Sequence, residues 1–312
     1  MAFRIVKKDI TKVKADAIVN TASSEPTYTE GTDRAIYEAA GVDYLLAERA
    51  RIGRLNVGQA APTPAFALPA RYVIHTVGPV WTDGTNGELE DLRRCYENSL
   101  EVAAELNCSS VAVPLIATEA YGFPKPEALK IAVSEIAEFL KEHDMKITLV
   151  VLDSEDFVLS GNVFSEVGDY VNKRMLENKG HEDASAEKAG KPAESPVPAE
   201  VKSWADTILW WIREKGYTDV EVYKRANVEK QLFDKIKNKE EYQPKKTTVV
   251  AFAMALRLNP DESRDLLKKA GFKLSMSNKF DLIIDYFLDH GIYDTYDVNL
   301  TLFDHKQPLL GE

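Results

Sequence analysis

The chain of 312 residues carries 39 basic and 50 acidic side chains, for a formal net charge of −11, and 45% of its residues are hydrophobic. This length allows two domains of ordinary size, each with its own core, and the balance of apolar and charged residues is typical of a soluble globular protein. The acidic excess argues against a surface that coats nucleic acid, although it leaves room for a small basic patch.

The sequence carries no signal for a membrane, a secretory route or a metal. Its apolar runs are shorter than the roughly 20 residues that span a bilayer, and its first residues lack the apolar segment of a signal peptide. Cys95 and Cys108 have no partner at the spacing of a metal or redox site, as is typical of reduced, packed thiols. We therefore expect a cytoplasmic protein without a metal or a cofactor.

Short apolar runs alternate with helical patterns over the first half of the chain. Because these runs are continuous rather than alternating, they predict strands covered on both faces. The strands are expected at residues 3–6, 17–20, 72–75, 110–115 and 147–152, and the helices at 33–40, 89–106, 126–141 and 162–176. This alternation predicts an α/β fold, a three-layer α/β/α sandwich over residues 1–176.

The composition changes after this first domain. Residues 177–200 hold almost no large apolar side chain and cannot bury enough surface to offset the entropy of ordering, which predicts a flexible linker. Residues 201–312 then show helical periodicity and form a smaller all-α domain, in which Asn259 and Pro260 mark a strong helix start.

Polar residues follow the predicted strands where each strand ends, and ligands of open α/β sheets bind beyond these ends. The segments concerned are Lys8-Asp-Ile-Thr11, Asp16-Ala-Ile-Val-Asn20, Arg71-Tyr-Val-Ile-His-Thr-Val-Gly-Pro-Val-Trp81 and Ala112-Val-Pro-Leu-Ile-Ala-Thr-Glu-Ala-Tyr-Gly-Phe-Pro124. In this order and at these spacings, residues 1–175 resemble the macrodomain family, whose members bind ADP-ribose and related nucleotides.

The resemblance implies roles for the first two motifs. Asp9 and the backbone of Ile10 would hold the adenine, since a carboxylate is a good acceptor for an exocyclic amino group. The alternative is that Asp9 only caps a turn before Thr11. Asn20 would order the loop that carries the distal ribose, and Ser23 stands where the family has a second Asn.

The resemblance also implies roles for two loops. Gly31 is retained from a glycine-rich stretch, and Asp33 matches an acid that positions or activates water in hydrolytic members; Asp33 could equally be a carboxylate favoured by a helix N-terminus. The residues matching the diphosphate cradle, which binds through backbone N–H groups, are Thr118, Glu119, Ala120, Tyr121 and Gly122.

The sequence leaves more than one role for the remaining residues of this site. Glu119 replaces a family Gly and would repel a diphosphate, so it either points outward or marks a different ligand. Tyr121 either flanks the distal ribose or packs in its loop. Leu152 would form part of the wall beside the base, whereas we expect His75 to be a buried strand end rather than a catalytic base.

In the second domain, the spacing of apolar residues over 222–238 is typical of two short helices joined by a tight turn near Asn227. Residues 217–272 therefore resemble the lambda-repressor-like helix-turn-helix family. A local excess of positive charge over residues 224–246 would then contact phosphates, and Lys230 and Gln231 could reach base edges. The alternative is a solvated helix face or a module that docks on a protein.

The leading hypothesis is a macrodomain that binds ADP-ribose or an ADP-ribosyl derivative, as a sensor coupled to a helical domain that interacts with DNA or a protein. One alternative is a hydrolase that removes ADP-ribose from proteins or deacetylates O-acetyl-ADP-ribose with Asp33. Another is a nucleotide-responsive DNA-binding regulator. The departures at Ser23, Thr29-Glu30 and Glu119 cluster at the chemical end of the site and favour binding over hydrolysis.

Overall fold

The computed structural model describes residues 2–151, 165–179, 196–201, 203–238 and 242–311. The chain divides into two compact units, Ala2–Ser160 and Gly161–Glu312, which are described separately. Over the described residues, no helix has the length and apolar character needed to cross a membrane.

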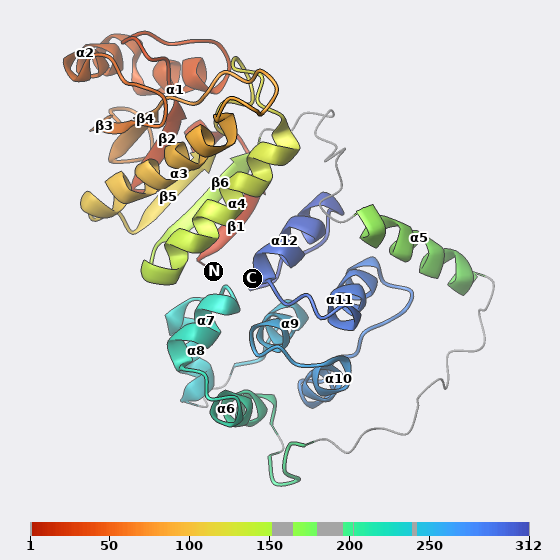
Figure 1. The fold of residues 1–312 in the computed structure, drawn as a ribbon. Helices are drawn as coiled ribbons and strands as arrows, with labels where there is room; N and C mark the ends of the chain where they lie inside the picture. The colour runs from red at the N-terminus through yellow and green to blue at the C-terminus, as the bar shows by residue number, and fades with distance from the viewer. Residues whose placement is uncertain (1, 152–164, 180–195, 202, 239–241, 312) are drawn as a thin grey trace. The chain divides into compact units, whose positions relative to one another are not determined.

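The first unit is built on a six-stranded mixed sheet with the order β1-β6-β5-β2-β4-β3 (Figure 1). Neighbouring strands are parallel except β3, which pairs antiparallel with β4 at one edge. The strands are β1 Phe3–Lys7, β2 Ala17–Thr21, β3 Ala60–Pro64, β4 Tyr72–Thr76, β5 Ser110–Pro114 and β6 Lys146–Val151. Residues 17–19 of the central β2 are fully buried, as expected for a strand covered on both faces.

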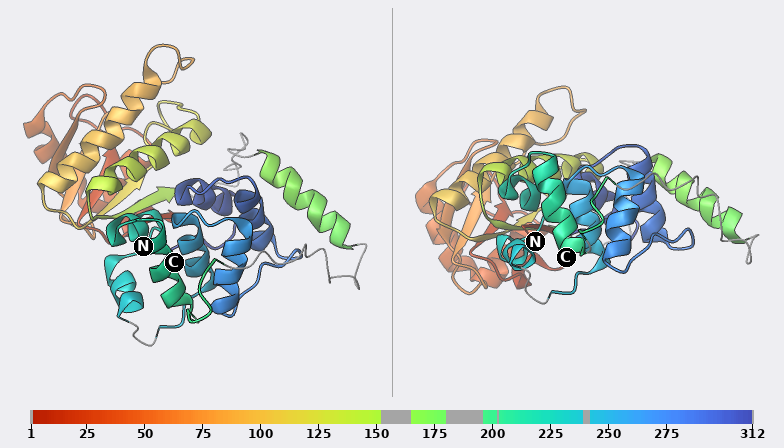
Figure 2. Two further views of the ribbon diagram at one scale, coloured as in Figure 1. Left: turned by 60° about the horizontal axis from the view of Figure 1, so that its bottom comes forward. Right: turned by 90° about the horizontal axis from the view of Figure 1, so that it is seen from below.

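Helices cover both faces of this sheet, which confirms the predicted three-layer α/β/α sandwich. The helices are η1 Ile10–Lys12, α1 Thr32–Ala40, α2 Val42–Ile52, α3 Glu88–Glu105 and α4 Lys125–Glu142. Helices α3 and α4 lie side by side on one face (Figure 1 and Figure 2). The opposite face packs Ile18, Val73 and Ala112 of three strands against Ile10 and Ile36 of η1 and α1.

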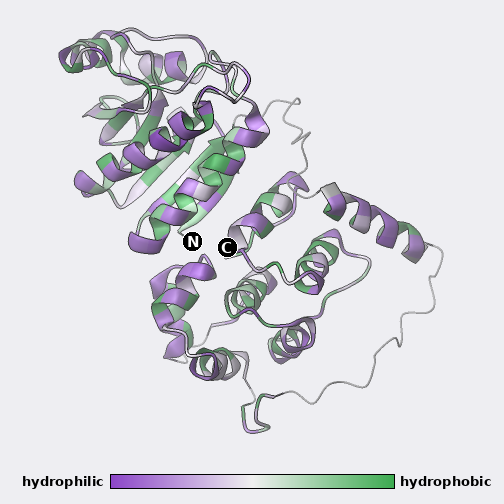
Figure 3. Cartoon of the chain, in the orientation of Figure 1, coloured by the Kyte–Doolittle hydropathy of each residue, from purple (hydrophilic) through white to green (hydrophobic). Residues whose placement is uncertain are grey.

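The second unit is all helical, as predicted. Its helices are α5 Ser165–Lys179, α6 Trp204–Glu214, α7 Asp219–Arg225, α8 Lys230–Lys237, α9 Lys246–Ala255, α10 Pro260–Lys269, α11 Lys279–Asp289 and α12 Thr295–Asp304. Apolar residues dominate the central α9 (Figure 3), of which residues 248–255 are buried. Asn259 caps α10 in a reciprocal capping box with Glu262, as the sequence indicates.

Helix α5, which the sequence predicts as the last helix of the sheet domain, packs on α11 within the second unit. The Tyr170 hydroxyl donates to Asp285 Oδ2 at 3.2 Å, and the Tyr286 hydroxyl donates to Glu166 Oε2 at 3.1 Å. The helix begins at Ser165, so residues 162–164 of the expected helix and 180–195 of the expected linker lie outside the described residues. The domain boundaries at 176 and 201 stay predictions.

Asp16 ties the start of β2 to the start of β5. Its Oδ2 accepts from Ser109 N at 2.8 Å, Ser109 Oγ at 2.6 Å and Ser110 N at 3.1 Å. The bonds from Ser109 and Ser110 lower the pKa of the Asp16 carboxyl below its ordinary value of 3.8, against a smaller opposing effect of burial.

We expect Asp16→Asn to lower the free energy of unfolding by about 1 kcal/mol at pH 7, because a partly exposed charged acceptor is lost. A pKa lowered by folding stabilises the protein above the ordinary pKa, and this contribution disappears as the pH falls through the folded pKa. Urea unfolding at pH 7 and near pH 3 measures the difference, with the exposed Glu97→Gln of α3 as control. A penalty independent of pH would contradict this role.

Candidate functional site

The candidate site lies beyond the carboxyl ends of β2 and β5. Asn20 and His75 are directly paired in the parallel register of β2 and β4. Because side chains alternate along a strand, Asn20 shares a face with Ile18, the face that packs against α1. The end of β2 is also joined to the loop after β5, since Ala117 N donates to Thr21 Oγ1 at 3.2 Å.

A buried polar network lies beneath this edge of the sheet. Asn20 Nδ2 donates to Asp33 Oδ1 at 2.8 Å and lies 3.2 Å from His75 Nδ1, and all three side chains are fully buried. Since Asn20 donates to Nδ1, the proton of neutral His75 is assigned to Nε2, which lies 3.0 Å from Thr63 Oγ1. His75 is therefore the buried strand end that the sequence indicates.

Asp33 fixes the loop that precedes α1. Its Oδ2 accepts from Thr29 N at 2.7 Å and from Thr29 Oγ1 at 3.1 Å, while Oδ1 is held by Asn20. Burial raises the pKa of Asp33, against the lowering effect of the bonds from Asn20 and Thr29. Both carboxylate oxygens are thus engaged inside the protein, and the acid supports the loop from the first turn of α1.

Arg49 of α2 holds the loop after β2, a residue that the sequence analysis missed. Its side chain is fully buried, and Nη2 donates to the carbonyls of Ser23 at 3.0 Å and Ser24 at 3.2 Å, while Nη1 donates to Gly53 O. Arg49 follows Leu45 by four residues and shares its buried helix face. A cation at a core position of an amphipathic helix is the signal that could have found it.

Glu119 is exposed at the surface, and its carboxylate bridges two loops. Its carboxylate accepts from Thr32 N at 2.7 Å and from Thr32 Oγ1 at 2.9 Å, at the first turn of α1. Gly31 has a φ of 74°, and a Cβ there would lie 1.9 Å from Glu119 Oε2, so this approach needs glycine. The Glu119 carboxylate is thus held by two donors at the helix N-terminus, while the residue stays exposed.

The bridge leaves little space between the two loops. The cavity there measures about 10 Å³, hardly room for one water molecule. It is lined by Thr21, Thr29, Glu30, Ala117, Glu119, Ala120 and Tyr121. The structure therefore brings Asn20, Gly31 and Asp33 together with residues 119–121, although they come from distant parts of the chain.

The remaining predicted residues lie around this group. Asp9 Oδ1 accepts from Thr11 N at 2.9 Å and Thr11 Oγ1 at 2.7 Å, so Asp9 does cap the turn, and its side chain is exposed above the buried Ile10. Ser23 is half-buried, and Thr118 Oγ1 donates to Leu115 O at 3.1 Å. Leu152 lies outside the described residues.

The loop after β5 is shaped by two residues with positive φ, Ala117 at 63° and Gly122 at 66°. Gly122 N donates to Glu119 O and Tyr121 O accepts from Trp81 N, while the Tyr121 hydroxyl lies 3.4 Å from Ala22 O. Within the described part of the chain, no hydrogen bond uses the backbone N–H groups of residues 118–121. Consecutive unused N–H groups in a turn are suited to bind an anion.

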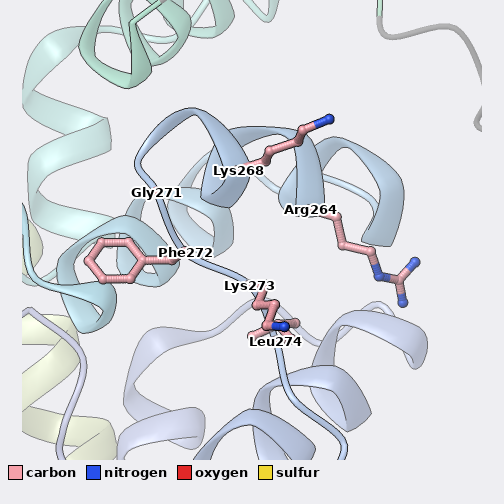
Figure 4. A pocket seen from close by; sticks show the side chains of 6 residues that line it. All are labelled: Arg264, Lys268, Gly271, Phe272, Lys273 and Leu274. Atoms are coloured by element: carbon pink, nitrogen blue, oxygen red, sulfur yellow. The ribbon is translucent and has the colours of Figure 1, made fainter. Parts of the chain in front are cut away.

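A larger cavity of about 640 Å³ lies in the second unit, where α10 ends (Figure 4). It is lined by Arg264, Lys268, Gly271, Phe272, Lys273 and Leu274. Arg264 also pairs with Asp261 and Asp285. None of the residues predicted to bind a nucleotide or DNA lines this cavity.

Three of the basic residues proposed to contact DNA take part in contacts within the second unit. Lys237 pairs with Asp219, Lys246 pairs with Asp281, and the Arg225 guanidinium lies 4.6 Å from the centre of the Tyr217 ring. Helices α7 and α8 meet across a turn at Asn227, whose φ is 53°. These contacts favour a solvated helix face over a phosphate-binding surface.

Comparison with known proteins identifies the class. The family model described as "Macro domain" matches residues 19–132. A "Macro domain-containing protein" of Methanosarcina mazei is 44% identical over 149 residues, which cover 48% of this chain and 79% of the relative. An "O-acetyl-ADP-ribose deacetylase" of Escherichia fergusonii is 40% identical over 170 residues, covering 53% of this chain and 96% of the relative.

A solved macrodomain of Oceanobacillus iheyensis with ADP is 36% identical, with a TM-score of 0.48, and the match covers 54% of this chain and 92% of that chain. From the sequence relatives, this chain belongs to the macro domain family through its first unit. Comparison gives no support for a helix-turn-helix domain in the second unit or for coupling to DNA.

The buried ring of His75 makes the free energy of unfolding depend on pH. Burial, together with the nearby positive charge of Arg49, lowers the pKa of His75 from 6.5 to about 3. The folded protein therefore favours the neutral ring. The resulting contribution to the free energy of unfolding is fully present above pH 6.5 and is lost as the pH falls toward 3.

We expect His75→Gln to flatten this dependence, since one proton linked to unfolding contributes a slope of about 1.4 kcal/mol per pH unit in that range. Urea unfolding of the parent and the variant between pH 7 and pH 4.5 measures the slopes. The partly exposed His143→Gln serves as control. Equal slopes for the parent and His75→Gln would show that His75 is not buried as the neutral form.

Proposed function

We propose that the first unit binds ADP-ribose or an ADP-ribosyl derivative beyond the carboxyl ends of β2 and β5, as a binder rather than a hydrolase. The observation that carries the proposal is the loop after β5, where residues 118–121 present backbone N–H groups beside the loop fixed by Asp33. Such a turn suits a diphosphate without Lys or Arg. Membership of the macro domain family and the relatives named deacetylases of O-acetyl-ADP-ribose support the nucleotide class.

We place the adenine at Asp9. Both capping bonds from Thr11 go to Oδ1, and the side chain is exposed, so Oδ2 can accept from an exocyclic amino group. Helix η1, which Asp9 caps, contacts α1 and β5, the elements that bear the two loops of the cleft. The distal ribose would then lie toward Asn20 and Ser23.

Binding without turnover fits the position of Asp33 in this structure. Its carboxylate is fully buried and both oxygens accept hydrogen bonds from Asn20 and Thr29. A general base must reach the proton that it takes, directly or through one water. Asp33 would have to release the loop to do so, whereas as a support it keeps the loop in place for binding.

The competing function is hydrolysis, either of ADP-ribosylated protein or of O-acetyl-ADP-ribose. It is favoured by the relative named O-acetyl-ADP-ribose deacetylase, because the aligned region covers 96% of that relative. In that case Asp33 would be the carboxylate that positions or activates the attacking water, as the resemblance to hydrolytic macrodomains implies.

Titration calorimetry of the full chain with ADP-ribose tests the proposed function. We expect a Kd below about 1 mM, roughly −4 kcal/mol. Asp9→Asn keeps an Oδ1 that can cap Thr11 but places an NH₂ group where the carboxylate faced the adenine amine. The variant should therefore bind about 10- to 150-fold more weakly, which corresponds to the 1.5–3 kcal/mol of a charged hydrogen bond.

The same swap should favour a hypoxanthine analogue, whose carbonyl oxygen accepts where adenine donates. An Asp9→Asn variant that binds ADP-ribose as tightly as the parent would exclude this adenine position. The exposed Asp43→Asn of α2 is the matched control and should bind like the parent.

Turnover is tested separately, with a protein mono-ADP-ribosylated on acidic residues and with O-acetyl-ADP-ribose. We expect slow or no release of product, because Asp33 is engaged by Asn20 and Thr29. Gel-based loss of the ADP-ribose label and chromatographic detection of free acetate are the measurements. Several turnovers per minute, abolished by Asp33→Ala in a variant that still binds ADP-ribose, would establish the enzyme instead.

A further inference from the structure

We propose that Glu119 sets which ligand the cleft accepts: its carboxylate occupies the anion position at the first turn of α1, and a nucleotide binds only by displacing it. This inference rests on the proposed function, since it concerns the same cleft. One side chain would then both close the cleft and determine which nucleotide binds more tightly.

The contacts of Glu119 are those of a bound anion. Thr32 N and Thr32 Oγ1 both donate to it, at 2.7 Å and 2.9 Å, from the N-terminus of a nine-residue helix. The helix dipole and charge-assisted hydrogen bonds stabilise a carboxylate there. The lack of a side chain on Gly31 provides the space, because any Cβ would collide with Oε2.

This bridge closes the cleft. It joins the loop after β5 to the start of α1 across 87 positions of sequence, and the cavity between them holds only about 10 Å³. A diphosphate on the N–H groups of residues 118–121 would meet the carboxylate of Glu119 in the same turn. Two anions so close repel each other, so the ligand must break the bonds to Thr32 and move Glu119 away.

The closure also predicts selectivity. A terminal phosphate bears close to two negative charges at neutral pH, whereas the phosphates of ADP-ribose each bear one. ADP should therefore suffer more from Glu119 than ADP-ribose does. Removing Glu119 should improve the binding of both ligands and should improve ADP binding more.

Three variants separate displacement from simple repulsion. Glu119→Ala removes the charge and the bridge. Thr32→Val removes one donor of the bridge and keeps the charge. Glu127→Ala is the matched control, because Glu127 is an exposed acid in the first turn of another helix, α4, and does not line this cavity.

Calorimetry with ADP-ribose and ADP gives the decisive comparison. We expect Glu119→Ala to tighten ADP-ribose binding about tenfold and ADP binding by several-fold more. Thr32→Val should tighten binding about threefold, and Glu127→Ala should change it by about twofold at most. In the Glu119→Ala background, Thr32→Val should have no further effect. The proposal would be overturned if Glu119→Ala left the affinity for ADP-ribose unchanged. It would also be overturned if Thr32→Val tightened binding equally with and without Glu119, or if Glu119→Ala tightened the binding of both ligands by the same factor.

Hydrogen exchange of the unliganded chain tests the closure without a nucleotide. We expect the hydrogen-bonded amides of Thr32, Ala117, Gly122 and Phe123 to exchange about tenfold faster in Glu119→Ala than in the parent. Melting temperatures are recorded to confirm folding. Unchanged exchange would overturn the closure even if ADP-ribose binds. If exchange accelerates but neither the parent nor any variant binds ADP-ribose, the closure stands and the proposed function fails.

Discussion

The arrangement of the site depends on one buried carboxylate. Asp33 sits in the first turn of α1 without solvent contact, and such a charge is tolerated only when hydrogen bonds replace its water. Asn20 supplies one donor from the end of β2, and Thr29 supplies two from the loop. Because these donors come from different elements, satisfying Asp33 fixes the strand end, the loop and the helix start together.

The neighbouring loops are held by the same kind of bond. Arg49 donates to the carbonyls of Ser23 and Ser24 from a buried position, and Glu119 accepts from Thr32. Charged side chains thus hydrogen-bond to backbone groups that secondary structure leaves unpaired. These bonds fix the conformation of the loops at the end of the sheet. Glu119 fills the space between these two loops, so in our proposal the same bonds that order the cleft also close it to a nucleotide.

Much of this unit could be predicted from sequence. Continuous apolar runs gave five strands and the sandwich, and polar residues at the strand ends pointed to Asn20 and the loop after β5. Strand β3 was not predicted, because Pro62 and Pro64 argue against a strand in a sequence pattern. Prolines are nevertheless tolerated in an edge strand such as β3. The Glu119–Thr32 bridge was missed because it joins residues 87 positions apart. Helix α5 was predicted as a helix, but its packing partner α11 lies more than a hundred residues away, beyond what local periodicity reveals.

A crystal structure of the full chain grown with ADP-ribose tests the central claim most directly, that the loops after β2 and β5 form a nucleotide cleft closed by Glu119. The account predicts the diphosphate on the backbone N–H groups of residues 118–121, the adenine against Asp9, and the Glu119 carboxylate detached from Thr32. Asn20, Asp33 and Thr29 should keep their hydrogen bonds. A nucleotide bound elsewhere, or bound in this cleft with Glu119 still on Thr32, would contradict the account.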